Sequence, residues 1–546
     1  MIKLFLKNPL KFISTRVSSL VQNQRAFSKA HAATSVLQNN FISKLSRYKI
    51  NWDDSKKSVV LVQSVSDYQM CIKIAAASHQ LATEKKANIA YYSAEHETYF
   101  YNSQLNSLST KNFKTTLDKI FLSFAGKLIY RNNHLFHDQQ KINTLVAKII
   151  DQTKNKQDVL NIEIENIKLG DLIYDTYLRY ADKPELDLRD PFFKILIAQT
   201  CNIFYVSKQK IEEFNIVSLV SSYTTYIYHG IAVRICLQKN IPVYTVGAYY
   251  SLVHKVLKEY PSHANDHFLF NKLFQKLENK NKIIETHKAI FEKRFEGVID
   301  SATSYMKQSA FSADTNKELE TIDWPNTVVV LAHCFFDSPH IYRDLLFPDF
   351  YDWMNFTLDE LSKQKDLTIL VKQHPNGLPA NDPLFEVLKK KYAGTKILFI
   401  DKKTSQMQII NSRPKAIVTA YGTAAAEFSY EGFPVLTIYD NPFTAYDFTH
   451  LANSVNEYKE LLQNVKNLPS KQNREQIIEY YYMQYFFFLK GKEIDYLMCA
   501  KYKGQTFSDT FLQDYLPNMT PTYFEMLDAA IKDGFLMCDW EAKALA

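Results

Sequence analysis

Short apolar, β-branched runs alternate with helix-forming stretches in two series along this chain. The first series has runs at 58–65, 88–93, 127–131, 215–222 and 241–247. The second series has runs at 326–333, 367–373, 396–400, 415–420 and 433–439. Continuous apolar runs separated by helical segments are typical of a parallel sheet that helices cover on both faces. The pattern therefore predicts an α/β fold with two Rossmann-like, doubly wound domains.

The remaining segments define how these two domains are joined. Residues 264–320 are charged, almost free of glycine and helical in pattern, and the aromatic C-terminal segment has no new strand series. We expect a basic arm (1–52), a first Rossmann-like domain (53–260), a helical linker (261–322), a second Rossmann-like domain (323–470) and C-terminal helices that pack across both domains (471–546). Two such domains place a central ligand cleft between the carboxyl ends of their sheets.

The net charge of +7 is concentrated in the arm. Among 546 residues, 65 Lys and Arg oppose 58 Asp and Glu, yet nine basic residues precede the first acid, Asp53. They are Lys3, Lys7, Lys11, Arg16, Arg25, Lys29, Lys44, Arg47 and Lys49. Residues 1–52 therefore carry +9 and the rest of the chain carries −2. A nearly neutral body disfavours nucleic-acid binding, which needs clustered Lys and Arg.

The start of the arm has the pattern of an amphipathic helix. Apolar residues recur at steps of three and four within 1–22, while Lys3, Lys7 and Lys11 repeat every four residues. Lysine interrupts the segment too often for a bilayer span of about 20 apolar residues, but such a helix can lie on an anionic membrane surface. A mitochondrial presequence and an ordinary helix packed on the body remain alternatives.

Several common site motifs are absent from the sequence. There is no G-x-G-x-x-G, no P-loop, no C-x-x-C and no Cys/His pair at zinc-ligand spacing. No Asp-x-Asp follows a predicted strand. We therefore expect neither a dinucleotide dehydrogenase nor a P-loop NTPase, and no metal or other cofactor, although Asp337 could still ligate Mg²⁺.

The strongest constellation of polar residues lies in the second domain. Lys372 and His374 stand where a predicted strand ends, and Pro375 stops that strand. At a later strand end, Gly422 permits a tight turn and Thr423 begins a helix, whose free N–H groups can bind an anion.

Other residues near these strand ends are also candidates. Glu427 lies one helical turn after Thr423 and can bind ribose hydroxyls. His333, Asp337 and His340 flank the first strand end of the domain, where a ligand contact and a structural role in the loop remain open.

Three segments of the second domain and one of the first resemble the bacterial capsule and surface-polysaccharide glycosyltransferases of the GT-B fold, especially the Kdo-transferase-like group. They are VKQHP (371–375), YGTAAAEFSYEGFPVL (421–436), LAHCFFDSPHIYRDLLFPDFYDW (331–353) and IKLGDLIYDTYLRY (167–180). The resemblance implies a GT-B-like pair of facing domains whose second domain binds a CMP-activated sugar acid. It also implies that His374 contacts the donor phosphate with Lys372 beside it, and that Thr423 and the backbone after Gly422 bind that phosphate too.

The residues that would act on the acceptor are predicted on one helix of the first domain. Asp171, Asp175 and Arg179 follow at four-residue steps and share one face. A carboxylate there can act as general base or as nucleophile. Arg179 either binds a sugar carboxylate or pairs with Asp175. His229 lies at another predicted strand end, where a catalytic role and a buried hydrogen bond are both open.

These observations predict a cytoplasmic glycosyltransferase, peripheral to the inner face of the cytoplasmic membrane. It would transfer an acidic sugar, Kdo or a nonulosonic acid, from a CMP-activated donor to a lipid-linked surface or capsular glycan, with other polysaccharide-assembly enzymes as further partners. One alternative is a glycerophosphotransferase-like enzyme that uses a CDP-activated alcohol. The other is an inactive GT-B-fold assembly partner.

Overall fold

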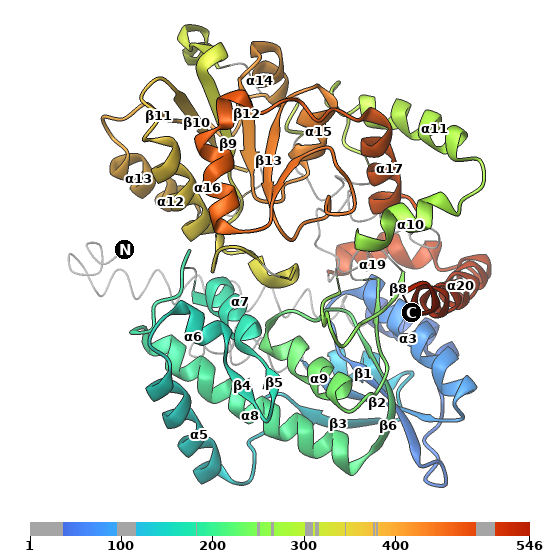
Figure 1. Cartoon of the computed structure of the whole chain (residues 1–546). Coiled ribbons are helices and arrows are strands. Elements are labelled where there is room, and N and C mark those ends of the chain that lie inside the picture. The colour runs from blue at the N-terminus through green and yellow to red at the C-terminus, as the bar shows by residue number, and fades with distance from the viewer. Residues whose placement is uncertain are drawn as a thin grey trace, which may run out of the picture.

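The protein is represented by a computed structural model that contains two six-stranded sheets, each in its own domain, and a two-stranded hairpin (Figure 1). It describes residues 36–94, 116–181, 183–247, 252–263, 267–300, 309–311, 316–343, 345–374, 377, 381–487 and 508–545. The hairpin consists of β4 (Glu163–Ile164) and β5 (Ile167–Lys168).

The first sheet has the strand order β3-β2-β1-β6-β7-β8. Its strands are β1 (Ser58–Gln63), β2 (Asn88–Ser93), β3 (Lys127–Arg131), β6 (Asn215–Ser221), β7 (Val243–Val246) and β8 (Val253–Lys255). All neighbours are parallel except β8, which runs antiparallel to β7. From β1 the chain adds strands first on one side, as β2 and β3, and then on the other, as β6 and β7. Ligands of doubly wound folds bind where this order reverses, which here is between β1 and β6.

The second sheet repeats this topology with the order β11-β10-β9-β12-β13-β14. Its strands are β9 (Thr327–Leu331), β10 (Thr368–Lys372), β11 (Ile397–Ile400), β12 (Ala416–Thr419), β13 (Val435–Ile438) and β14 (His450–Ala452). All of its strands are parallel, and its reversal point lies between β9 and β12. The predicted pair of doubly wound domains is confirmed.

Helices cover both faces of each sheet, which explains why the central strands are continuously apolar. Every residue of β9 is buried. The main covering helices are α3 (Tyr68–Glu84), α8 (Pro191–Glu213) and α9 (Tyr226–Gln238) in the first domain, and α12 (Phe350–Leu361), α13 (Asn381–Lys391), α14 (Gln406–Ser412), α15 (Ala424–Tyr430) and α16 (Val455–Gln463) in the second. The short strands β8 and β14 and the β4–β5 hairpin were not predicted, because two or three residues carry no periodic signal.

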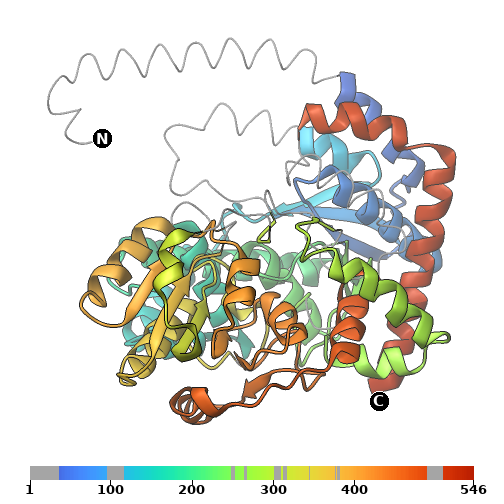
Figure 2. The ribbon, with the colours of Figure 1, turned by 90° about the horizontal axis from the view of Figure 1, so that it is seen from above.

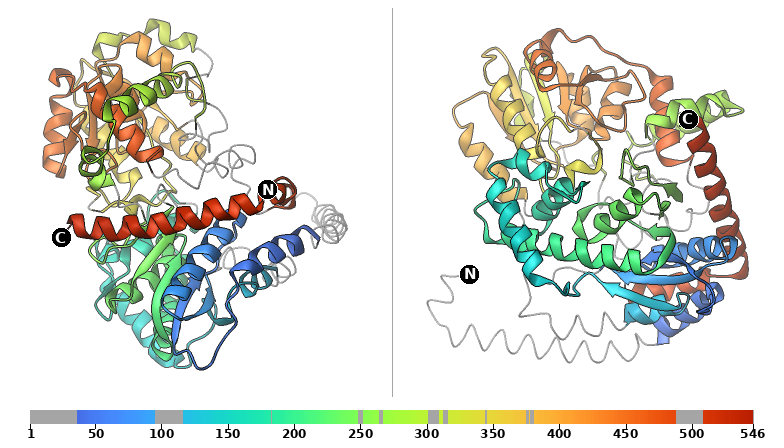
Figure 3. Two further views of the ribbon diagram at one scale, coloured as in Figure 1. Left: turned by 90° about the vertical axis from the view of Figure 1, so that its right-hand side faces the viewer. Right: turned by 60° about the horizontal axis from the view of Figure 1, so that its bottom comes forward.

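The segment between the domains and the C-terminal segment are helical. The linker helices α10 (Phe270–Gln275) and α11 (Lys280–Glu292) pack against α17 (Arg474–Tyr485) beside the second domain. The last helix, α20 (Pro521–Leu545), returns to the first domain and packs on α3 and β8 (Figure 3).

Part of the segment assigned to the arm belongs to the first domain. Residues 36–45 form a helix that lies beside the C-terminal segment (Figure 2). Phe41, Leu45 and Tyr48 are buried, and the Tyr48 hydroxyl donates to Asp528 at 2.7 Å. The amphipathic pattern of 1–22 lies outside the described residues. Within the described part of the chain, no helix combines the length and the apolar character needed to cross a membrane.

Loops at the carboxyl ends of the two sheets meet between the domains, as expected for a GT-B-like arrangement. Ser338, after β9, donates from Oγ to the hydroxyl of Tyr226, after β6, at 3.2 Å. The short helix η6 (Pro339–Ile341) of the same loop packs against α7 (Gly170–Ala181) of the first domain. The loop after β9 and helix α7, which carry His340 and Asp175, therefore lie on sides of the two domains that face each other.

Candidate functional site

Three neighbouring strands of the second sheet end at one edge and bring predicted residues together. Lys372 is the last residue of β10, His333 follows β9, and Gly422 follows β12. A Cβ atom on Gly422 would lie only 3.0 Å from Thr419 Oγ1 and 3.6 Å from His333 Nε2, so the turn leaves little room for a side chain. We call His333, Lys372, His374, Gly422 and Thr423 the strand-end cluster.

Lys372 is a buried cation within this cluster. Its side chain is 1% exposed and makes no hydrogen bond or ion pair with any residue that the structure describes. Burial lowers its pKa to about 8, against the opposing charges of Asp401 and Glu427. A buried ammonium group without a hydrogen-bonded acid is costly, and a bound anion would compensate for that cost.

The two imidazoles of the cluster are neutral at physiological pH. Burial and the charge of Lys372 lower the pKa of His374 to about 4. Burial and His374 lower the pKa of His333 to about 3, and His333 Nε2 accepts a hydrogen bond from the N–H of Tyr421 at 3.2 Å. The positive charge of the cluster therefore resides on Lys372, while the imidazoles provide hydrogen bonds.

The structure places the other residues predicted for this site as follows. Thr423 is the N-cap residue of α15, and its hydroxyl does not cap that helix. Asp337 is exposed, and its carboxylate accepts from the N–H of Ser338 at 3.1 Å within its own loop. Pro375 lies outside the described residues. Their roles as ligand contacts stay predictions.

Glu427 is buried and engaged by the linker. Its carboxylate accepts from Arg294 Nη1 at 3.2 Å, and Arg294 also pairs with Asp300 at 2.7 Å. Burial raises the pKa of Glu427, although the Arg294 guanidinium opposes that rise. The guanidinium lies 4.7 Å from the ring centre of Tyr481. Sequence reasoning missed Arg294, because nothing local in the turn after α11 indicates a partner 133 residues away. The predicted ribose contact of Glu427 remains a prediction.

The predicted carboxylates of α7 have separate partners. Asp171 forms a two-pronged ion pair with Arg234 of α9. Burial acts to raise the pKa of Asp171, but the Arg234 guanidinium outweighs it and the pKa lies below its usual value. Arg234 also donates to the carbonyl of Lys168 at 2.5 Å. Asp171 is therefore part of a hydrogen-bonded group within the first domain.

Asp175 reaches the second domain. Its Oδ1 lies 2.5 Å from Nδ1 of His340, and Asp175 is 3% exposed. The expected alternative of an Arg179–Asp175 ion pair does not form: Arg179 is exposed, and within the described part of the chain it has no ion pair. A histidine from the opposite domain occupies Asp175 instead, which helix spacing alone could not reveal.

His229 lies in the first turn of α9, after β6, and contacts Gln63 at the end of β1. Its Nδ1 is 3.0 Å from Oε1 of Gln63, and burial lowers its pKa to about 4. Gln63 in turn donates to the hydroxyl of Tyr92 at 2.7 Å. The histidine is therefore neutral and held by a buried hydrogen-bond network, and a catalytic role for it stays untested.

A second set of contacts joins α7 to the second domain. The Tyr174 hydroxyl donates to Asp349 at 2.6 Å, and Lys156 lies 3.2 Å from the same carboxylate and 2.8 Å from Asp352. Asp349 is fully buried and also caps α12. These contacts hold α7 against the second domain.

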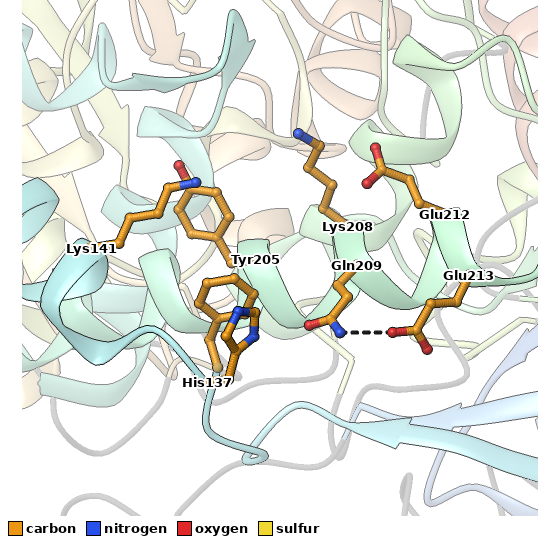
Figure 4. A pocket seen from close by; sticks show the side chains of 8 residues that line it. His137, Lys141, Tyr205, Lys208, Gln209, Glu212 and Glu213 are labelled. Carbon is orange, nitrogen blue, oxygen red and sulfur yellow. Dashed lines mark hydrogen bonds between the residues drawn. The ribbon is translucent and has the colours of Figure 1, made fainter.

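A pocket of about 450 Å³ lies elsewhere, on the first domain between α5 (Gln139–Gln152) and α8 (Figure 4). It is lined by Phe136, His137, Lys141, Tyr205, Lys208, Gln209, Glu212 and Glu213. None of the predicted site residues lines it. Its charged side chains have partners outside the lining or lie over a ring: Lys208 bonds to Glu165, Glu212 to Lys239 and Glu213 to Lys210, and Lys141 lies 4.1 Å from the ring centre of Tyr205. We assign no chemistry to this pocket. Among the described residues, no group of three or more His, Cys, Asp or Glu side chains is arranged to hold a metal ion.

Comparisons with known proteins give only distant likenesses. No family model matches the chain, and no curated protein matches it. The beta Kdo 2,4 transferase KpsC of Thermosulfurimonas dismutans is 10% identical, with a TM-score of 0.28 over 50% of this chain and 80% of that one. The UDP-GlcNAc 2-epimerase of Methanocaldococcus jannaschii is 10% identical, with a TM-score of 0.25 over 77% of this chain and 97% of that one.

The wall teichoic acid polymerase TagF is also 10% identical, with a TM-score of 0.21 over 90% of this chain and 98% of that one. Scores this low carry no argument about family or activity. The assignment of two Rossmann-like domains therefore rests on the strand order of the two sheets.

Proposed function

We propose that this protein is a glycosyltransferase that binds a nucleotide-activated sugar at the strand-end cluster. The observation that carries the proposal is Lys372, a buried cation without a hydrogen-bonded acid among the described residues. Two neutral imidazoles and the Gly422–Thr423 turn lie beside it. This arrangement supplies one charge and several hydrogen bonds to a phosphate, as stabilisation of a departing nucleotide requires.

The finer assignment rests on the sequence resemblance. We propose that the donor is a CMP-activated acidic sugar and that the acceptor is a lipid-linked glycan. The basic residues of the N-terminal arm support this acceptor, because a lipid-linked substrate requires the enzyme at an anionic membrane surface. His374 and Lys372 would contact the phosphate, and Glu427 would retain one oxygen for the ribose.

Calorimetry with CMP, CDP and UDP is the first test, since an inactive assembly partner predicts no nucleotide binding. Transfer assays with CMP-sugars and CDP-alcohols then separate the glycosyltransferase from a glycerophosphotransferase-like enzyme. We expect His374→Ala to abolish transfer with the fold intact, and His137→Ala, an exposed histidine of the first domain, to serve as the matched control. Wild-type turnover of His374→Ala would remove the phosphate assignment.

A further inference from the structure

His340 is held rigidly between the two domains. It belongs to η6, after β9, and its Nδ1 lies 2.5 Å from Oδ1 of Asp175 on α7. The next residue, Ile341, accepts hydrogen bonds at its carbonyl from Ser262 Oγ at 2.6 Å and from the Tyr260 hydroxyl at 3.2 Å. The Asp175 contact therefore orients the His340 ring, and the hydrogen bonds to Ile341 hold the backbone beside it.

The opposite ring nitrogen of His340 is available for chemistry. Because an ionised carboxylate only accepts, its contact with Asp175 places the proton on Nδ1 and leaves the lone pair of the neutral ring on Nε2. This Nε2 atom is buried, and the structure gives it no hydrogen-bond partner within the described residues. A buried polar atom without a partner is rare, and a ligand group or a water molecule is the usual explanation.

Among the described carboxylates near the His340 ring, Asp175 is the one that bonds to it. Asp171 accepts a hydrogen bond from Arg234 at 2.6 Å. Asp349 is likewise occupied, by Tyr174 and Lys156.

The charges of the pair favour a basic imidazole. Burial raises the pKa of Asp175 to about 6, against the opposing effect of His340. Burial alone would lower the pKa of His340, but the charge of Asp175 outweighs it and raises that pKa. Asp171 and Asp349 add smaller contributions in the same direction. The imidazole is therefore a stronger base than a free histidine.

We propose that His340 is the general base that accepts the proton of the acceptor hydroxyl, and that Asp175 is its positioning residue. The inference rests on the proposed glycosyltransferase function. The sequence predicted a carboxylate such as Asp175 as the general base, whereas this inference gives that role to His340, which contacts Asp175. The acceptor oxygen forms a bond to the anomeric carbon as the bond from that carbon to the phosphate oxygen breaks. The bonding electron pair leaves with the nucleotide phosphate, towards Lys372, and the hydroxyl proton moves to His340 Nε2.

The test measures kcat, KM and their pH dependence for His340→Gln and Asp175→Asn. We expect His340→Gln to lower kcat by about 10²- to 10⁴-fold, as loss of a general base does, while CMP still binds as in the wild type. Asp175→Asn removes the charge that raises the pKa of His340, so the acidic limb of the kcat profile should move to lower pH and kcat should fall. Imidazole added to His340→Ala should restore part of the transfer.

A matched control is available in a second buried pair, in which His267 Nε2 lies 3.2 Å from Asp440. His267→Gln loses a comparable contact and should keep the acidic limb of the wild type. Wild-type kcat in His340→Gln, or an unmoved acidic limb in Asp175→Asn, would overturn the role of the pair and leave the donor site standing. A wild-type protein that binds no nucleotide and transfers no sugar would overturn the proposed function itself, and this inference with it.

Discussion

Replacing Lys372 by methionine should change stability and nucleotide binding in opposite directions. Methionine keeps most of the side-chain volume and removes the charge. Lys372 is 1% exposed, so the folded protein holds its ammonium group away from water. If the cluster is an anion site, the substitution should stabilise the empty protein and weaken its affinity for nucleotides.

The size of the stability effect follows from the pKa. Burial lowers the pKa of Lys372 from 10.5 to about 8. At about 1.4 kcal/mol for each pH unit, that difference corresponds to about 3 kcal/mol against the charged form in the folded state. Below pH 8 the group is charged in both the folded and unfolded states, so the full cost applies. The cost disappears as the pH rises from 8 to 10.5, because the folded protein releases the proton first.

Urea unfolding at pH 7 and at pH 10.5 measures this effect. We expect Lys372→Met to raise the free energy of unfolding by about 3 kcal/mol at pH 7, and the gain to vanish near pH 10.5. Lys365→Met, at an exposed lysine of the same domain, is the control and should change little. In calorimetry, loss of a charged hydrogen bond of about 1.5–3 kcal/mol predicts CMP binding weaker by about 10- to 150-fold.

Two results would refute this reasoning. A Lys372→Met protein that is less stable than the wild type at pH 7 would mean that the ammonium group is already compensated within the fold. Unchanged CMP affinity would mean that the nucleotide phosphate binds elsewhere. Groups that serve a ligand are often destabilising in its absence, so the opposite signs are the expected signature of a binding site.

Three further outcomes are expected. Arg294→Met leaves the buried carboxylates of Glu427 and Asp300 without their cation and should lower the free energy of unfolding by about 3–5 kcal/mol. Partial restoration of stability in the double variant with Glu427→Gln would support the pairing, and an unaltered melting temperature of the single variant would contradict it. Tyr174→Phe removes a hydrogen bond from the buried Asp349 and should cost about 1–3 kcal/mol in urea unfolding, whereas an unchanged midpoint would show that the contact adds nothing. Deletion of residues 1–35, which spares the helix packed on the first domain, should abolish sedimentation with anionic vesicles, and undiminished sedimentation would exclude the arm as the tether.

The sequence alone predicted the architecture well, for a physical reason. A strand that helices cover on both faces must be apolar along its length, so β9 and β10 are visible as runs of β-branched and apolar residues. The strand-end cluster was also predictable, because the carboxyl ends of parallel strands meet at one edge of the sheet. Lys372 and Gly422 were singled out by their positions immediately after such runs.

Only the tertiary structure decided which partner each charged side chain has. Spacing along α7 suggested a local pair between Asp175 and Arg179, yet Asp175 contacts His340 of the opposite domain, 165 residues away. Glu427 is joined in the same way to Arg294 of the linker. Local periodicity reflects which face of an element is buried, whereas these pairs depend on how segments far apart in the sequence pack together. The sequence therefore determined the two domains and the sheet edge that carries the strand-end cluster, and the packing of distant segments decided which charged groups pair.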